Sequence, residues 1–218
     1  MPPDGWRRRA WLLAHCSLWL AAPALAKGNT PRHVVLVVGD SLSAEYGIGR
    51  GQGWVALLEQ RMRAEKIDAR VVNASISGDT TSGGRSRLPA LLKQHRPTHV
   101  VIELGGNDAL RGLPLAMTRD NLNAMAGEAR HAGARVLVAG MQVPPNYGRD
   151  YGTQFAALFA DVAKAHQAAL VPFLLAGVAD VPDAERWFQA DRIHPVAQAH
   201  PKILDNVWAV LRPQLTRP

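Results

Sequence analysis

The chain has 218 residues, a formal net charge of +7, eight histidines and a single cysteine. This length fits one domain with a sizeable core, and a single cysteine excludes both a disulfide framework and a thiolate metal site. Lysines and arginines are scattered rather than interleaved with aromatic residues, which indicates a basic but soluble surface and argues against a nucleic-acid partner.

The first 26 residues have the pattern of a secretory signal peptide. Three arginines at residues 7–9 precede an apolar stretch at 10–20, and Ala24 and Ala26 form a small-x-small cleavage site. Cleavage after Ala26 removes three arginines and one aspartate, which lowers the net charge from +7 to +5. The sequence therefore predicts a periplasmic or secreted protein, with an uncleaved anchor as the alternative.

Residues 27–218 are predicted to be a single mature domain. They contain no apolar run of 18 residues, so we expect no stable membrane insertion after signal cleavage. The cysteine, Cys16, leaves with the signal, and His15 before it does not fit a lipoprotein signal. The mature chain must therefore fold without disulfides, and we expect a monomer.

The first predicted strand of this domain is its most distinctive stretch. Residues 34–38 are five apolar residues, four of them valine, as in a strand buried on both faces of a parallel sheet. The sequence GDSLS follows at residues 39–43, which places Ser41 at the carboxyl edge of the sheet, where ligands bind in open α/β folds. The alternative is an ordinary turn in which Ser41 or Asp40 caps the next helix.

Strands and helices alternate along the rest of the chain. Further strands are predicted at residues 70–74, 100–104 and 135–139, with a weak one at 170–174. Helical spacing of apolar residues predicts helices near residues 54–62, 83–94, 122–129, 155–166 and 203–211. This alternation predicts an α/β fold with a doubly wound parallel sheet, in which the loops after strands one, two, three and five converge.

A serine nucleophile needs a base and an acid that orients the base. Asp191 and His194 lie three residues apart in one irregular stretch, close enough for the carboxylate to reach the imidazole within a turn. The other histidines fall in the signal, in predicted helices or at the beginning of strands. The alternative is that Asp191 caps a helix and His194 is a surface histidine.

Two further residues can stabilise an oxyanion. Gly78 follows the second strand and offers a backbone N–H that a ligand can approach closely. Asn107, in the GGND stretch at 105–108 after the third strand, offers a side-chain amide. The alternative for Asn107 is a turn former, because glycine, asparagine and aspartate favour turns.

Taken in order, GDSLS at 39–43, Gly78, GGND at 105–108 and DRIH at 191–194 resemble the four blocks of the GDSL or SGNH hydrolase family. The chain is especially similar to its bacterial periplasmic lysophospholipase, thioesterase and arylesterase branch. The resemblance implies a flavodoxin-like three-layer α/β/α sandwich with a five-stranded sheet, and a serine esterase without metal or cofactor.

The resemblance also implies a role for each residue. Ser41 is the nucleophile, His194 the base and Asp191 the acid that orients it, while the N–H groups of Ser41 and Gly78 and the amide of Asn107 form the oxyanion hole. Residues 27–218 are then the catalytic domain, and the partner is a small-molecule ester.

Two residues depart from the pattern of that branch. Glu45 and Arg192 stand where its members more often carry glycine. An arginine at position 192 is able to crowd or recharge the turn that holds the acid and the base.

Apolar residues in the loops around the predicted site favour an acyl or aryl group over a sugar. They are Leu110, Leu113, Val143, Pro144 and Tyr147. The alternative is that some of them only pack the loops, and Arg111 is either a partner for an anionic head group or a solvated charge. A carbohydrate O-deacetylase and a non-catalytic periplasmic binding module remain alternative functions.

Overall fold

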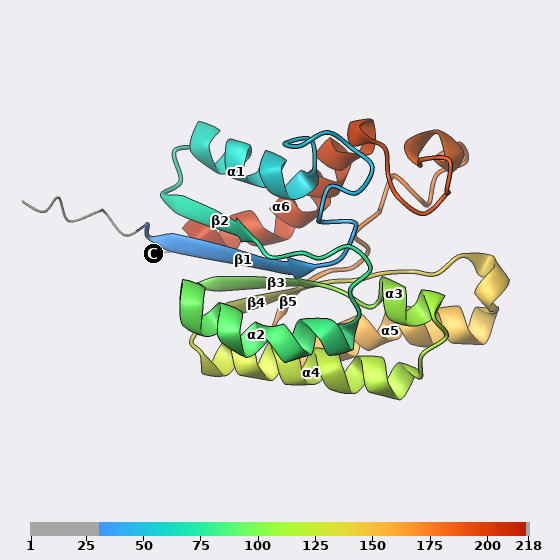
Figure 1. Ribbon diagram of the computed structural model, residues 1–218, viewed down its shortest axis with the longest axis horizontal. Coiled ribbons are helices and arrows are strands. Elements are labelled where there is room, and N and C mark those ends of the chain that lie inside the picture. The colour runs from blue at the N-terminus through green and yellow to red at the C-terminus, as the bar shows by residue number, and fades with distance from the viewer. Residues whose placement is uncertain (1–30, 217–218) are drawn as a thin grey trace, which may run out of the picture. The chain divides into compact units, whose positions relative to one another are not determined.

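Five parallel strands form one sheet in the order β2-β1-β3-β4-β5 (Figure 1). They are β1 (His33–Gly39), β2 (Ala69–Asn73), β3 (His99–Glu103), β4 (Arg135–Ala139) and β5 (Ala169–Val171). This strand order is the flavodoxin-like one, so the predicted fold is confirmed. The computed structural model describes residues 31–216, and the predicted signal peptide at 1–26 lies outside the described residues.

Helices cover both faces of the sheet, which gives three layers (Figure 1). On one face α1 (Trp54–Ala64) packs against α6 (His200–Thr216). The other face is covered by α2 (Thr81–His95), α4 (Leu115–His131) and α5 (Arg149–Ala165). Four short helices lie in the connections: α3 (Gly106–Leu110), η1 (Pro145–Tyr147), η2 (Ala184–Trp187) and η3 (Ala197–Ala199).

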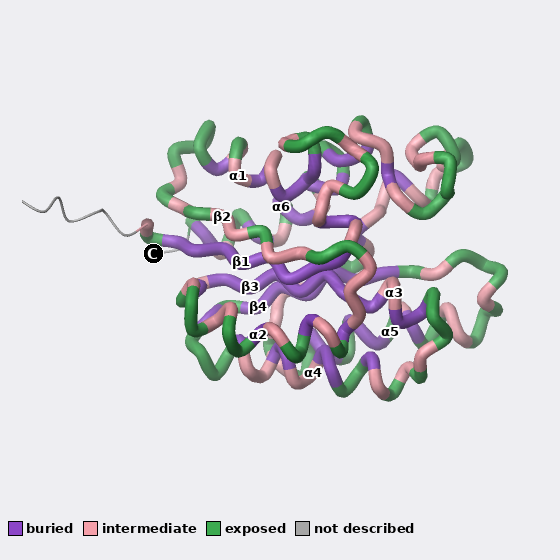
Figure 2. Tube along the Cα trace, in the orientation of Figure 1, coloured by how far each residue is buried: buried purple, intermediate pink, exposed green. Residues whose placement is uncertain are grey.

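The core lies between these layers, and the central strands are its most buried part (Figure 2). Every residue of β1 and β3 is buried, because both strands have a neighbour on each side and helices above and below. Strand β2 is at the edge of the sheet and has no fully buried residue. The predicted two-sided burial of residues 34–38 is therefore confirmed.

The ends of several elements differ from the predictions by a few residues. Helix α5 begins at Arg149, six residues before its predicted beginning, because its first turns contain Gly152 and charged residues that hide the apolar period. Helix α2 begins at Thr81, where the Thr80 side chain accepts a hydrogen bond from the N–H of Gly83. The last strand stops at Val171, since Pro172 follows it.

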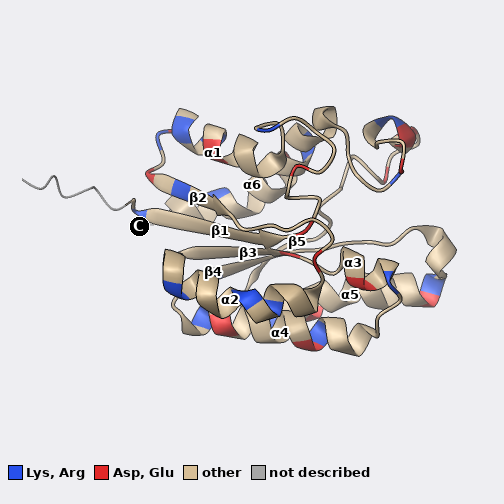
Figure 3. Cartoon of the chain, in the orientation of Figure 1, with Lys and Arg blue, Asp and Glu red and all other residues tan. Residues whose placement is uncertain are grey.

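The loops at the carboxyl ends of the strands form the edge that carries the candidate site. Acidic positions occur among these loops, whereas lysines and arginines are spread mainly over the helices (Figure 3). Within residues 31–216, no helix combines the length and the apolar character needed to cross a bilayer.

Candidate active site

Ser41 lies two residues beyond the end of β1, in a tight turn built on Asp40. The main-chain oxygen of Asp40 accepts the N–H groups of Ser43 and Ala44, at 3.2 and 3.0 Å. Position 39 has no room for a side chain, since a Cβ there would lie 2.6 Å from a carboxyl oxygen of Glu103. The glycine therefore lets the strand pass close to Glu103 before the chain turns.

His194 and Asp191 lie in the stretch before α6, and the fold brings them to Ser41. His194 Nε2 is 2.9 Å from Ser41 Oγ, and His194 Nδ1 is 2.7 Å from Asp191 Oδ2. The other oxygen of Asp191 accepts the N–H groups of Ile193 and His194, both at 3.0 Å. Three residues separated by up to 153 positions of sequence thus form one hydrogen-bonded chain.

These hydrogen bonds fix the charge of the acid. Bonds from the main-chain N–H and the ring of His194, with the N–H of Ile193, lower the pKa of Asp191 to about 2. The carboxylate is therefore ionised at neutral pH, and it can orient the imidazole and stabilise an imidazolium.

An aromatic residue that the sequence analysis did not single out packs on the imidazole. The Tyr46 ring lies 4.2 Å from the His194 ring, measured between centroids, with the planes inclined by 36°. Tyr46 is half exposed, and its main-chain oxygen accepts a hydrogen bond from Gln189. The contact limits the freedom of the imidazole on the solvent side.

The three predicted oxyanion donors also lie at this edge. Gly78 has φ +79°, a conformation that favours glycine, and the side chain of Arg111 donates to its carbonyl oxygen at 2.8 Å. Arg111 is thus engaged with the loop that carries Gly78. Within residues 31–216, the N–H groups of Ser41 and Gly78 donate to no acceptor, so both are available to a ligand.

Asn107, predicted as an oxyanion donor with a turn former as the alternative, is in the first turn of α3. Its Nδ2 donates to Asp40 Oδ2 at 3.0 Å, which ties the loop after β3 to the turn that carries Ser41. Each amide nitrogen carries two hydrogens, so one N–H remains for a second acceptor.

Arg87 on α2 also binds the carboxyl edge of the sheet, and the sequence did not predict this contact. Its Nε lies 2.8 Å from Asp79 Oδ2, its Nη2 donates to the Gly39 oxygen at 3.3 Å, and its Nη1 donates to the Ala74 oxygen. One guanidinium therefore joins the ends of β1 and β2 to the loop of Gly78. A helical arginine gives no sequence signal for the contacts with the two strand ends, because the partners there are main-chain oxygens.

The five predicted substrate-binding residues lie in loops after β3 and β4. Leu110 and Pro144 are exposed, while Leu113, Val143 and Tyr147 are partly buried. Val143 lies beside Gly152, and Tyr147 stacks on Tyr151 with 5.9 Å between ring centroids, so both also pack against α5. Their role in substrate binding stays a prediction.

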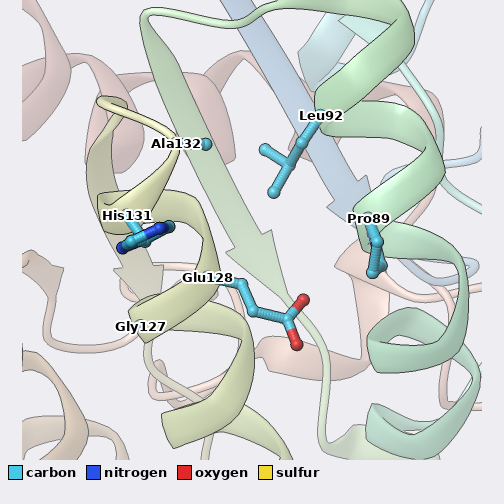
Figure 4. Close-up of a pocket in the computed structure, with 6 residues that line it drawn as sticks. All are labelled: Pro89, Leu92, Gly127, Glu128, His131 and Ala132. Carbon is cyan, nitrogen blue, oxygen red and sulfur yellow. The ribbon is translucent and has the colours of Figure 1, made fainter.

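A separate apolar hollow of about 450 Å³ lies between α2 and α4 (Figure 4). It is lined by Pro89, Leu92, Gly127, Glu128, His131 and Ala132. None of the residues around Ser41 contributes to it, so it is not part of the candidate active site.

Comparisons with known proteins show which proteins the chain resembles. The model of the GDSL-like Lipase/Acylhydrolase family matches residues 37–201. The chain is 50% identical to the protein named Esterase TesA of Pseudomonas aeruginosa, over 95% of this chain and 100% of that protein. It is 42% identical to the protein named Thioesterase 1/protease 1/lysophospholipase L1 of Escherichia coli K12, over 82% and 83% of the two chains.

Among solved structures, the psychrotrophic esterase EstA from Pseudoalteromonas sp. matches with a TM-score of 0.79 and 38% identity. The match covers 85% of this chain and 100% of that one, and the structure is described as inhibited by monoethylphosphonate. The family model matches well over half of the chain, and the Pseudomonas aeruginosa and Escherichia coli relatives are each more than 40% identical to it over most of their length. The chain therefore belongs to the GDSL-like lipase/acylhydrolase family, as its four motifs predicted, and is a serine hydrolase of the esterase type.

Proposed function

We propose that this protein hydrolyses acyl and aryl esters through an acyl-enzyme on Ser41. The observation that carries the proposal is the hydrogen-bonded chain Ser41–His194–Asp191, with distances of 2.9 and 2.7 Å, beside two unengaged N–H groups. A hydroxyl, a base and an ionised acid in this order are what nucleophilic acyl transfer requires.

The reaction begins when Ser41 Oγ attacks the ester carbonyl carbon and His194 Nε2 takes the hydroxyl proton. The imidazolium that forms is stabilised by Asp191. Negative charge moves to the carbonyl oxygen, where the N–H groups of Ser41 and Gly78 and the amide of Asn107 donate to it. His194 then gives the proton to the alcohol oxygen as the bond between that oxygen and the carbonyl carbon breaks, which leaves the acyl group on Ser41 Oγ.

Deacylation repeats these steps with water. His194 takes a proton from the water molecule, the hydroxide oxygen bonds to the acyl carbon, and the bond to Ser41 Oγ breaks as the proton returns to it. The carboxylic acid leaves and the free serine is restored.

The substrates we propose are small-molecule esters with an acyl chain or aryl group, with thioesters and lysophospholipids as further substrates. Relatives named as an esterase and as a thioesterase and lysophospholipase support this range. Exposed Leu110 and Pro144 would contact the apolar part of the substrate.

Two substitutions test the assigned roles. We expect Ser41→Ala to abolish hydrolysis of p-nitrophenyl esters and labelling by a fluorophosphonate, because no other nucleophile replaces the hydroxyl. Asn107→Ala should lower kcat by about 10²–10³, the usual loss for one oxyanion donor. Ser86→Ala, an exposed serine on α2, is the matched control and should keep wild-type turnover. Full turnover of folded Asn107→Ala would refute its role.

A chain-length series of p-nitrophenyl esters, compared with acetylated oligosaccharides, separates the substrate classes. Rates that rise from acetyl to longer acyl groups would support the lipid or aryl specificity. Activity on acetylated sugars alone would favour the O-deacetylase, and an unlabelled Ser41 would favour a binding module.

We also propose that residues 1–26 direct export to the periplasm or beyond and that the mature protein acts as a monomer. Intact-mass analysis of the exported protein tests the first part, because cleavage after Ala26 leaves Lys27 as the first residue. A mass that retains the first 26 residues would contradict it, and size-exclusion chromatography tests the second part.

A further inference from the structure

Two carboxyl groups that the proposed mechanism does not use lie buried directly behind Ser41. Asp40 is 2% exposed and Glu103, the last residue of β3, is fully buried. The main-chain N–H of Asp40 points to Glu103 Oε2 at 3.3 Å, so the two residues are in contact. Burying two charged carboxylates side by side is very costly, and such pairs keep one proton between them.

The contacts of Asp40 favour it as the charged member. Its Oδ1 accepts the N–H of Leu42 at 3.0 Å, and its Oδ2 accepts the amide of Asn107 at 3.0 Å. Both oxygens are therefore acceptors, which suits a carboxylate, whereas a protonated acid has a hydroxyl on one oxygen.

The contacts of Glu103 suit the neutral member. Trp54 Nε1 donates to Ser43 Oγ at 3.1 Å, so the hydroxyl proton of Ser43 is directed to Glu103 Oε2, 2.5 Å away. The other oxygen, Oε1, is buried and has no partner within residues 31–216. An ionised carboxylate with one unsolvated, unpaired oxygen is much less favourable than a neutral acid.

The surrounding charged groups are consistent with a charged Asp40 and a neutral Glu103. Burial and the charge of Asp40 raise the pKa of Glu103 well above its usual range. Burial also raises the pKa of Asp40, to about 6, and Asp79 adds to the rise, while the Leu42 and Asn107 hydrogen bonds and His194 oppose it. Arg87 reaches only the main-chain oxygen of Gly39 in this turn.

We propose that Asp40 is a positioning residue whose carboxylate holds the amide of Asn107 for the oxyanion, and that Glu103 is held neutral beneath it to keep this turn in place. With one Nδ2–H bound to Asp40, the amide cannot rotate freely, and its second Nδ2–H stays directed away from Asp40. The inference rests on the proposed oxyanion role of Asn107.

Asp40→Asn is the first test. Asparagine has an NH2 group, which cannot accept, in place of one of the two carboxylate oxygens, so either Leu42 or Asn107 loses its acceptor. We expect kcat to fall by about 10- to 100-fold with KM little changed. In an Asn107→Ala background the same change should cost less than about threefold, because the amide that it orients is gone. Asp161→Asn, an exposed aspartate on α5, is the matched control.

Glu103→Gln is the second test, because glutamine has the shape of a neutral glutamic acid. We expect near-wild-type kcat and an unchanged acid limb in the pH profile of kcat/KM. Were Glu103 charged, the substitution would remove a neighbouring negative charge, lower the pKa of Asp40 and move the acid limb to lower pH. Glu128→Gln, at a remote acid that also has an unpaired buried oxygen, is the control.

The outcomes separate this inference from the function on which it rests. A strong effect of Asn107→Ala with no effect of Asp40→Asn, or additive losses in the double variant, would overturn the positioning role. No effect of Asn107→Ala would instead refute the oxyanion assignment. If Asp40→Asn does not fold, the pH profile of Glu103→Gln still decides whether Glu103 is neutral, and a shifted acid limb overturns the inference.

Discussion

His200→Asn is predicted to remove a large part of the acid sensitivity of the fold. His200 is the first residue of α6 and is 2% exposed, and its Nδ1 accepts the N–H of Trp54 at 3.1 Å. Trp54 begins α1, whose N-cap residue Gly53 has no side chain to accept a hydrogen bond. The imidazole therefore acts as the cap, and it can do so only while Nδ1 is unprotonated.

The size of the stability loss follows from the pKa of His200. Burial lowers the pKa of His200 from 6.5 to about 4, and the negative charge of Glu45 only partly opposes it. Because the folded state resists protonation, this contribution to stability is fully present above the unfolded pKa of 6.5 and is lost progressively as the pH falls from there to the folded pKa of about 4. Linkage gives a loss of about 2 kcal/mol in the free energy of unfolding between pH 7 and pH 5.

Urea unfolding of wild type and variant at pH 7 and pH 5 measures this loss. The Asn side-chain oxygen takes the place of Nδ1 as acceptor and does not titrate, so the variant should lose about 2 kcal/mol less than wild type on acidification. His131→Asn, at an exposed histidine of α4, is the matched control. Equal pH dependence of wild type and His200→Asn would refute the argument. Wild type and variant must be compared because two other groups make the stability of both proteins depend on pH. They are His99, whose pKa is also lowered to about 4, and Asp40.

Three further sets of substitutions test local contacts. Gly39→Ala places a Cβ 2.6 Å from Glu103 Oε2 and should destabilise the protein by about 1–3 kcal/mol in urea unfolding; an unchanged midpoint would contradict the packing. Tyr46→Ala removes the ring on His194 and should lower kcat by about two- to fivefold, whereas Tyr46→Phe should keep it; equal losses would point to the hydroxyl. Glu45→Gly should be less stable than Arg192→Gly by about 1–3 kcal/mol, because only Glu45 accepts two main-chain N–H groups, at 2.9 Å each; equal stabilities by urea unfolding would show that these bonds contribute nothing.

Much of the candidate site could be predicted because its residues directly follow strands. A run of five apolar residues, four of them valine, is typical of a buried central strand, as residues 34–38 prove to be. Parallel strands bring the loops that follow them to one edge. Asp191 and His194 were selected because three residues suffice for a carboxylate to reach an imidazole. The structure brings both to Ser41 as that spacing indicated.

The supporting contacts could not be predicted, because they depend on where side chains point. Arg87 looks like any helical arginine, and only the fold shows that its guanidinium reaches two strand ends. Glu103 did leave a signal, since it is an acid within the otherwise apolar strand predicted at residues 100–104. Such an acid needs a partner or a proton, and this argument was available from the sequence alone.

Glu45 and Arg192 show how a departure from a family pattern acquires a physical meaning. Both adopt left-handed backbone conformations, with φ of 60° and 59°, where glycine has no steric penalty. Glu45 offsets this cost because its Oε1 accepts the N–H groups of Gly51 and Gly53 and so organises the loop before α1.

The Arg192 side chain gives no comparable compensation, since its ion pair with Glu185 has a distance of 3.7 Å and both side chains are exposed. Arg192 is held instead by its neighbours, because Asp191, which precedes it, accepts the N–H groups of Ile193 and His194, which follow it. The acid of the proposed triad thus stabilises the turn that presents the base. It follows that replacing Asp191 removes the orientation of the imidazole and the main-chain support for Arg192 together, so loss of activity in such a variant measures both.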